Sequence, residues 1–280
     1  MTIVSETALA EWRATIGRRE SRTQMLDTES LRRFSVAVGG EGDVSAEHPP
    51  LAHWAWFLEV TPDALLGEDG HPRRGGFLPA IEALPRRMFA STAIHFEMPL
   101  LLDIEAEAVM RITDVRHKAG RSGDLVFVDI ERTISQKTRT RVVERQTLVY
   151  REAGDATPMA LPIPASDAVD MPAGGELWQP NPVHLFRFSA ATFNGHRIHY
   201  DHSYANEVEG YPALIVQGPF AAAKLAALAA KTGPLARFEF RAQAPLFVDQ
   251  QVRLARMGDG EFHAIRCDGV PSTIAKATYR

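Results

Sequence analysis

The sequence predicts an α+β fold made of two copies of a curved antiparallel sheet, each wrapped around a central helix. Segments with alternating or continuous apolar residues, separated by turn signals, occur in both halves of the 280-residue chain. The second half also contains an alanine-rich apolar stretch, Phe220 to Ala230, with helix start and stop signals at its ends. A short sequence echo between the halves favours a duplication.

In the first half, Asp27 or Thr28 can cap a short helix. This helix carries Leu31 and Phe34 on one face and ends at Gly39. Residues 66–87 are rich in Gly, Pro and Arg and are expected to form a loop. The central helix of this copy has no clear signal and is expected in degraded form around residues 49–66. The expected strands are His95 to Met98, Ala106 to Val115, Leu125 to Ser135 and Val142 to Tyr150.

In the second half, the start of the central helix is well marked. Gly218 is expected at the N-cap, Pro219 at the first helical position and Gly233 just beyond the end. A strictly alternating strand follows at Arg237 to Arg241, and Gly258-Asp-Gly260 predicts a hairpin turn.

The echo consists of Pro99-Leu-Leu-Leu-Asp103 and Pro245-Leu-Phe-Val-Asp249, each of which follows a strand and precedes further strands. It predicts a double hot-dog fold whose two sheets join edge to edge around a pseudo-twofold axis. We place the first copy at residues 1–152, a linker at 153–182 and the second copy at 183–280. The first copy is expected to be catalytically degenerate.

Composition excludes several classes of function. The formal net charge of -4 disfavours a nucleic-acid binder, which needs an excess of clustered Lys and Arg. A single cysteine, Cys267, allows no internal disulfide, and neither a metal site nor a cofactor is expected. No apolar stretch approaches the length that spans a bilayer, so no membrane partner is expected. The first residues lack a secretory or transit signal, which predicts a cytoplasmic location.

One stretch concentrates groups that can carry chemistry. Phe193-Asn-Gly-His-Arg-Ile-His-Tyr-Asp201 brings together an amide, imidazoles, a phenol and a carboxylate, shortly before the central helix. With Arg73-Arg-Gly-Gly-Phe77 and Gly120 to Phe127, it resembles the MaoC-like double hot-dog hydratases and dehydratases. The resemblance covers about residues 25–280. It points to the branch that holds the type 2 3-hydroxyacyl-thioester dehydratases and the mesaconyl-C4-CoA and itaconyl-CoA hydratases.

The resemblance implies roles for individual residues. The broader motif is Gly-Asp-x-Asn-Pro-x-His, and here Asn194 stands at its Asp position, His196 at its Asn position and His199 at its His position. His199 is therefore expected to be the general base that activates water. Asn194 cannot exchange protons usefully, but its amide can hold the water or orient the imidazole. Asp201 could supply the missing carboxylate if this stretch is extended.

Other residues are expected to hold the substrate. The backbone N–H of Gly218, at a helix N-terminus, can stabilise the charge that develops on the thioester oxygen. Gln217 is its neighbour and an alternative donor, and Tyr200 is a further binding candidate. Arg86 and Arg87 can bind CoA phosphates or an acyl carboxylate.

Plainer interpretations exist for several of these residues. Gly218 also suits an ordinary helix cap, and Asn194-Gly195 is a common turn dipeptide. His196 and His202 are expected to be structural hydrogen-bonding groups.

Taken together, these features predict a hydro-lyase that reversibly hydrates a 2-enoyl-CoA. A branched C5 dicarboxylic thioester, mesaconyl-C4-CoA or itaconyl-CoA giving citramalyl-CoA, leads among substrates through overall likeness. The alternatives are a 3-hydroxyacyl-thioester dehydratase of fatty-acid metabolism and, from another class, a non-catalytic acyl-CoA-binding protein. A homodimer is possible, because hot-dog sheets often pair.

Overall fold

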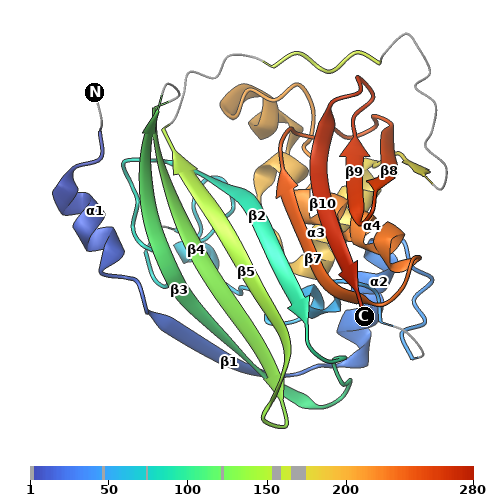
Figure 1. Cartoon of the computed structure of the whole chain (residues 1–280). Coiled ribbons are helices and arrows are strands. Elements are labelled where there is room, and N and C mark those ends of the chain that lie inside the picture. Colours follow the sequence, from blue (N-terminus) through green and yellow to red (C-terminus); the bar gives the residue numbers. More distant parts are fainter. Residues whose placement is uncertain (1–2, 46–47, 74, 121–122, 153–158, 165–174) are drawn as a thin grey trace.

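The computed structural model describes residues 3–45, 48–73, 75–120, 123–152, 159–164 and 175–280. Its strands are β1 (Arg19–Met25), β2 (Arg86–Phe96), β3 (Glu105–Gly120), β4 (Gly123–Gln136), β5 (Arg139–Arg151), β6 (Glu176–Trp178), β7 (Leu235–Ala242), β8 (Val252–Gly258), β9 (Glu261–Ile265) and β10 (Pro271–Tyr279). They form one ten-stranded sheet in the order β1-β3-β4-β5-β2-β7-β10-β9-β8-β6. All its pairings are antiparallel. Figure 1 shows the strands of both halves side by side in this curved sheet.

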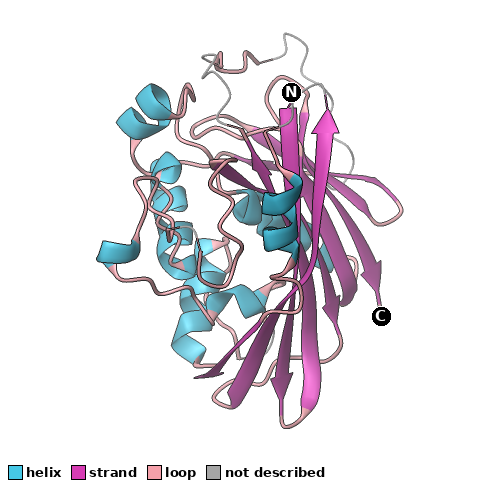
Figure 2. Cartoon of the chain, turned by 90° about the vertical axis from the view of Figure 1, so that its left-hand side faces the viewer, coloured by secondary structure: helices cyan, strands magenta, loops and turns pink. Residues whose placement is uncertain are grey.

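The helices are α1 (Glu6–Arg13), α2 (Thr28–Ala37), α3 (Pro182–Thr192) and α4 (Gly218–Ala230), with shorter helical turns between them. Figure 2 shows the helices gathered on one side of the sheet. Alternate residues of β4 are buried beneath them, as expected for a sheet that is covered on one face. Within the described residues, no helix is long and apolar enough to cross a membrane.

In the first half, the helix predicted after Asp27 is confirmed as α2. The Asp27 carboxylate accepts a hydrogen bond from Ser30 N at 2.8 Å, and Gly39 adopts the left-handed φ of +98° that ends the helix. The predicted strand His95 to Met98 is only the end of β2, which starts at Arg86. The apolar pattern missed the start because several early residues of β2 are only half buried.

In the second half, the predicted alanine-rich helix is confirmed as α4. Its N-cap is Gln217 rather than Gly218, so the helix begins one residue earlier than expected. Residues 176–178 of the expected linker form β6, which pairs with β8. The rest of the 153–182 prediction lies largely outside the described residues, so the boundaries of the two copies stay a prediction.

The two echo motifs lie at equivalent places, one between β2 and β3 and the other between β7 and β8. Their aspartates, Asp103 and Asp249, both adopt positive φ, at 54° and 62°. Asp103 N donates to Leu26 O just after β1, and Asp249 N donates to Pro180 O just after β6. The shared backbone geometry supports a duplicated origin for the echo.

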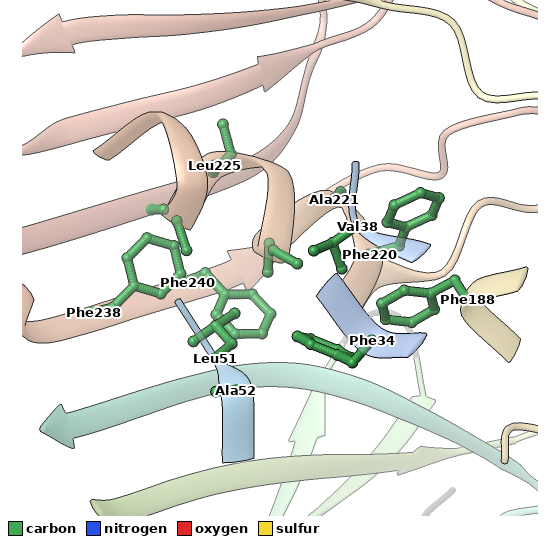
Figure 3. Close-up of a cluster of buried hydrophobic side chains, with 14 of the residues drawn as sticks. Phe34, Val38, Leu51, Ala52, Phe188, Phe220, Ala221, Leu225, Phe238 and Phe240 are labelled. Atoms are coloured by element: carbon green, nitrogen blue, oxygen red, sulfur yellow. The ribbon is translucent and has the colours of Figure 1, made fainter. Parts of the chain in front are cut away.

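The helices that follow these contacts also correspond. α2 starts after its N-cap Asp27 and α3 after its N-cap Asn181, and Phe34 and Phe188 stand at the same helical position. Their rings meet with centroids 6.4 Å apart, between the two halves. Figure 3 shows both rings next to Phe220 of α4, against which Phe188 stacks at 4.7 Å.

The halves join where β2 pairs with β7. Thr92 pairs with Phe240 and Ile94 with Phe238. Thr92 and Phe238 hold the same place before the echo motif of their own half, as do Ile94 and Phe240. The pairing therefore maps onto itself when the two halves are exchanged, which is the predicted pseudo-twofold arrangement.

The symmetry breaks at the central helix. α4 is enclosed by the second half, with Ala222, Leu225 and Ala226 fully buried. In the first half, residues 49–66 hold two 3-10 turns, η1 (Ala52–Ala55) and η2 (Asp63–Leu65), and no described α-helix lies between α2 and β2. The predicted degradation of the central helix in the first half is confirmed. The loop that follows η2 reaches the second half, where Arg197 N donates a hydrogen bond to Asp69 O at 2.9 Å.

Candidate active site

The stretch that carries the family motif, residues 193–201, is called the motif segment here and starts where α3 ends. Phe193 takes the left-handed conformation (φ 51°), and Asn194 N donates to Ser189 O at 2.9 Å. The side-chain oxygen of Asn194 accepts from His196 N at 3.1 Å. The amide of Asn194 thus shapes the loop before His199, in the way that Asn commonly supports a turn.

His199 lies at the end of the 3-10 turn η3 (Arg197–His199) and is buried, with 7% of its surface exposed. Its Nδ1 donates to Ile215 O at 2.7 Å, and Ile215 N donates to Ile198 O at 3.0 Å. These bonds hold the ring beside the chain that leads into α4. Because Nδ1 carries the proton, Nε2 is unprotonated and available as a base. Burial is the main cause that lowers the pKa of His199 to about 4, so the imidazole is neutral near pH 7.

The start of α4 faces free space. A Cβ built on Gly218 meets no atom within 4 Å, so a substrate group can approach this backbone closely. Gly218 is the first residue of α4, so its backbone N–H belongs to the turn whose donors have no acceptor inside the helix. The geometry suits a carbonyl oxygen that needs a donor and a favourable helix dipole.

The predicted role of Asp201 required an extended backbone. The structure instead has short helical turns before and after this residue. Asp201 Oδ2 accepts from Arg197 Nη2 at 2.8 Å, and Oδ1 accepts from Tyr204 N at 3.0 Å. The π-helical turn η4 (Tyr204–Val208) starts there. The turns bring Asp201 back onto Arg197 rather than onto His199, because a helical turn places residues four apart on one side.

The four predicted binding residues occupy different environments. Arg86 and Arg87 line a cavity of about 630 Å³, together with His71 and Tyr204. Tyr200 is exposed, and its hydroxyl donates to Gly195 O at 3.1 Å.

Gln217 is fully buried and touches α3 instead of the cavity. Its amide nitrogen donates to Leu185 O and to Ser189 Oγ, both at 2.9 Å. This arrangement fastens the start of α4 to α3. The amide nitrogen of Gln217 is therefore engaged by α3 and not available to a substrate.

Two residues that were not predicted from the sequence also reach the motif segment. His71 and Asp69 come from the loop that follows η2 in the first half. The His71 ring lies 4.2 Å from the ring of His196, which lies 5.4 Å from that of His199 (centroid distances). Asp69 Oδ2 accepts from His71 Nδ1 at 3.0 Å. His196, expected to be structural, thus sits between two other imidazoles.

Electrostatics in this cluster follow from burial and from the neighbouring imidazoles. Burial, helped by the nearby His71 and His199, lowers the pKa of His196 to about 2. Burial would raise the pKa of Asp69, but hydrogen bonds from the His71 ring and backbone N–H outweigh it and lower that pKa well below its usual range. Asp69 is therefore a carboxylate at neutral pH.

Among the described residues, Asp69, His71 and His196 also offer one possible ligand atom each within 4.8 Å of one another. Asp69 and His71 are bonded to each other, however, through the His71 nitrogen on that side. The Asp69 carboxylate thus occupies the Nδ1 side of the His71 ring.

The chain is also similar to proteins of known function. The family model described as hydroxyacyl-thioester dehydratase type 2 matches residues 51–248. Mesaconyl-C4-CoA hydratase of Chloroflexus aurantiacus is 41% identical over 263 residues, which cover 90% of this chain and 91% of that one. The mitochondrial hydroxyacyl-thioester dehydratase type 2 of Schizosaccharomyces pombe is 26% identical, over 73% of this chain and 76% of its own.

Solved structures share the fold. A MaoC-like dehydratase from Phytophthora capsici superposes with a TM-score of 0.67 at 13% sequence identity, covering 97% of this chain and 99% of that one. The predicted fold class and family are confirmed. With a family model that spans most of the sheet and both sides of the site, the chain belongs to the hydroxyacyl-thioester dehydratase type 2 family of hydro-lyases.

Proposed function

We propose that the chain hydrates a branched C5 dicarboxylic enoyl-CoA, with mesaconyl-C4-CoA as the first candidate and itaconyl-CoA as the second. The observation that carries the catalytic part is the buried, neutral His199 with a free Nε2, fixed beside the open N-terminus of α4. The substrate comes from the relative that is 41% identical over nine-tenths of the chain.

In the proposed reaction, His199 Nε2 takes a proton from water as the oxygen attacks the β-carbon. Charge moves onto the thioester oxygen, where the Gly218 N–H and the dipole of α4 stabilise it. A proton added at the α-carbon completes the product. Asn194 holds the loop that carries His199, and Asp201 holds Arg197 in the same loop.

The arginines of the cavity support a dicarboxylic substrate. Arg86 and Arg87 both line it, and guanidinium groups bind carboxylates and phosphates in a bidentate way. Replacing either with Gln is expected to raise KM for the dicarboxylic thioester more than for crotonyl-CoA, which has no second carboxylate. An equal rise for both would assign the arginines to the CoA part instead.

The test of the main proposal follows the loss of enoyl-thioester absorbance with mesaconyl-C4-CoA and with crotonyl-CoA. We expect turnover by the native chain and a loss of about 10²-fold to 10⁴-fold in His199→Asn, the range for removing a general base. Asn keeps a donor for the Ile215 carbonyl, so the fold is preserved. His202→Asn, at an exposed position just after the motif segment, is the matched control and should keep full activity.

Two other results would redirect the proposal. Preference for longer 3-hydroxyacyl thioesters would favour the fatty-acid dehydratase alternative, to which the yeast relative points. Binding of both thioesters without turnover would favour a non-catalytic acyl-CoA-binding protein. The proposal also includes a single active site in the second copy, a cytoplasmic location and, as the alternative to a monomer, a homodimer.

A further inference from the structure

The loop after η2 that carries Asp69 and His71 contacts the motif segment of the second half closely. Arg197 N donates to Asp69 O at 2.9 Å, and Arg197 Nη1 donates to Glu68 O at 3.1 Å. Gly70 packs against the carbonyl of Gly195 so closely that a Cβ built on Gly70 would overlap it. The two chain segments are thus fastened backbone to backbone, on either side of the imidazoles.

This contact delivers an oriented imidazole to the site. The Asp69 carboxylate bonds the Nδ1 side of the His71 ring, and the backbone N–H of His71 also donates to Asp69 at 2.9 Å. The Nε2 side is left to face other groups. The ring lines the 630 Å³ cavity that also contains Arg86 and Arg87, and 28% of its side chain is exposed there.

Neither Asn194 nor Asp201 suits the second proton transfer, and the other carboxylates on the cavity lining are exposed (Glu68, Glu82) or bonded to Tyr204 (Glu209). The family motif has a carboxylate where this chain has Asn194, and an amide does not exchange protons usefully near neutral pH. Asp201 is engaged by Arg197 and Tyr204. Burial raises the pKa of Tyr204 to about 12, and its hydroxyl donates to Glu209 at 3.4 Å.

We propose that His71, oriented by Asp69, is the second proton carrier of the hydration reaction, supplied to the catalytic half by the half that lost its central helix. The inference rests on the proposed function and deepens it. His71 is not a packing residue in this proposal but a catalytic residue that faces the substrate.

The proton count closes without another reactant. Water loses a proton to His199 Nε2 while its oxygen bonds to the β-carbon. The electron pair of the double bond moves toward the thioester carbonyl, and the α-carbon then bonds to a proton released by His71. His199 ends protonated and His71 deprotonated. A transfer from His199 to His71 through the intervening His196 ring restores both, and dehydration uses the same steps in reverse.

The test is chemical rescue. In His71→Ala the truncated side chain leaves room in an existing cavity, into which free imidazole can diffuse. We expect kcat for mesaconyl-C4-CoA to fall by about 10²-fold or more and KM to change little. Added imidazole should then raise kcat in a saturable way. Asp69→Asn should lower kcat less than His71→Ala, because it disturbs the orientation of the ring but leaves the imidazole in place.

Controls separate a chemical role from a structural one. His202→Ala, at an exposed position, should keep full activity and show no response to imidazole. Thermal unfolding of each variant checks that the loop has not collapsed. If His71→Ala is as stable as the native chain and hydrates at the native rate, His71 is not the carrier. A slow His71→Ala variant that imidazole leaves unchanged, or a native chain that dialysis against a chelator inactivates, would also overturn the proposal.

These outcomes are distinguishable from failure of the proposed function. If the native chain turns over no enoyl-CoA, the hydratase assignment itself falls. If the native chain is active and His199→Asn is inactive, but His71→Ala remains fully active, the hydratase assignment stands and only the role of His71 is lost.

Discussion

Replacing Gly70 with Ala is expected to reduce activity far more than stability. A Cβ on Gly70 would lie 2.9 Å from the carbonyl carbon of Gly195 and closer still to its oxygen, whereas real Cβ atoms essentially never come within 3.0 Å of another heavy atom. The loop must therefore move away from the motif segment by about 1 Å, and such a misplacement can cost about 10²-fold in rate.

The matched control is Gly269→Ala. Gly70 and Gly269 have nearly the same backbone angle, φ +84° and +86°, so each alanine adds about 1 to 2 kcal/mol of left-handed strain. A Cβ on Gly269, however, meets no atom within 4 Å. The strain is common to both variants, and the difference between them isolates the contact with Gly195.

The assay combines kcat/KM for enoyl-CoA hydration with urea unfolding of the same preparations. We expect Gly269→Ala to keep its activity and Gly70→Ala to lose about 10²-fold, which corresponds to about 2.7 kcal/mol of transition-state stabilisation. Equal activity in the two variants would show that the docking of this loop does not position the site, and would remove the basis for placing His71 in the reaction.

Three further predictions concern pH, packing and Asp201. Acid should destabilise the fold through His199. Its pKa is about 4 in the folded chain against the ordinary histidine value of 6.5, so the unfolded chain binds the proton first and stability falls as pH drops through that window. Between pH 7 and 5 the loss should be about 2 kcal/mol, and unfolding curves of His199→Asn should lack this contribution. Phe188→Ala should lower the free energy of unfolding by about 3 to 5 kcal/mol, whereas Phe186→Ala on the same helix should change it little, since the two residues are 1% and 66% exposed. A similar cost for both would mean that α3 packs differently. Asp201→Asn keeps the acceptor for Tyr204 N and loses the ion pair with Arg197, so turnover should fall by less than about tenfold; a fall of about 10²-fold or more would restore Asp201 as a proton carrier.

The predictable parts of the fold were those with a local cause. α2 and α4 carry their caps, terminal glycines and apolar faces within their own sequence, and both were found. β1 (Arg19–Met25) was missed because it is a polar edge strand, held by backbone pairing to β3 rather than by an apolar pattern. α3 did have a signal that could have been read, since Asn181-Pro182 is a strong helix start before the apolar positions Leu185 and Phe188.

The residues of the site also differ in whether the local sequence predicts them. His199 was predicted from the motif segment and the family resemblance, and Gly218 from the helix start signal. The structure has Gly218 as the first residue of α4 and His199 bonded to Ile215, just before that helix. The contact of His71 with His196 joins distant parts of the chain and depends on a loop that crosses from one half to the other. No local pattern encodes such a crossing, and Asp69 and His71 in a Gly/Pro-rich stretch have the composition of an ordinary loop. The role set for Asp201 depended on an extended backbone, and short turns of this kind are hard to read from single residues.

The strand pairing between β2 and β7 has a consequence for how such a protein can change. In an assembly of two identical hot-dog chains, every substitution appears twice, so one subunit cannot give up its helix while the other keeps it. Here the two halves are one polypeptide, joined through a register that either half could satisfy. Each half can therefore accumulate substitutions independently. A segment that no longer has to form a helix in one half can then be selected for a new role beside the other half.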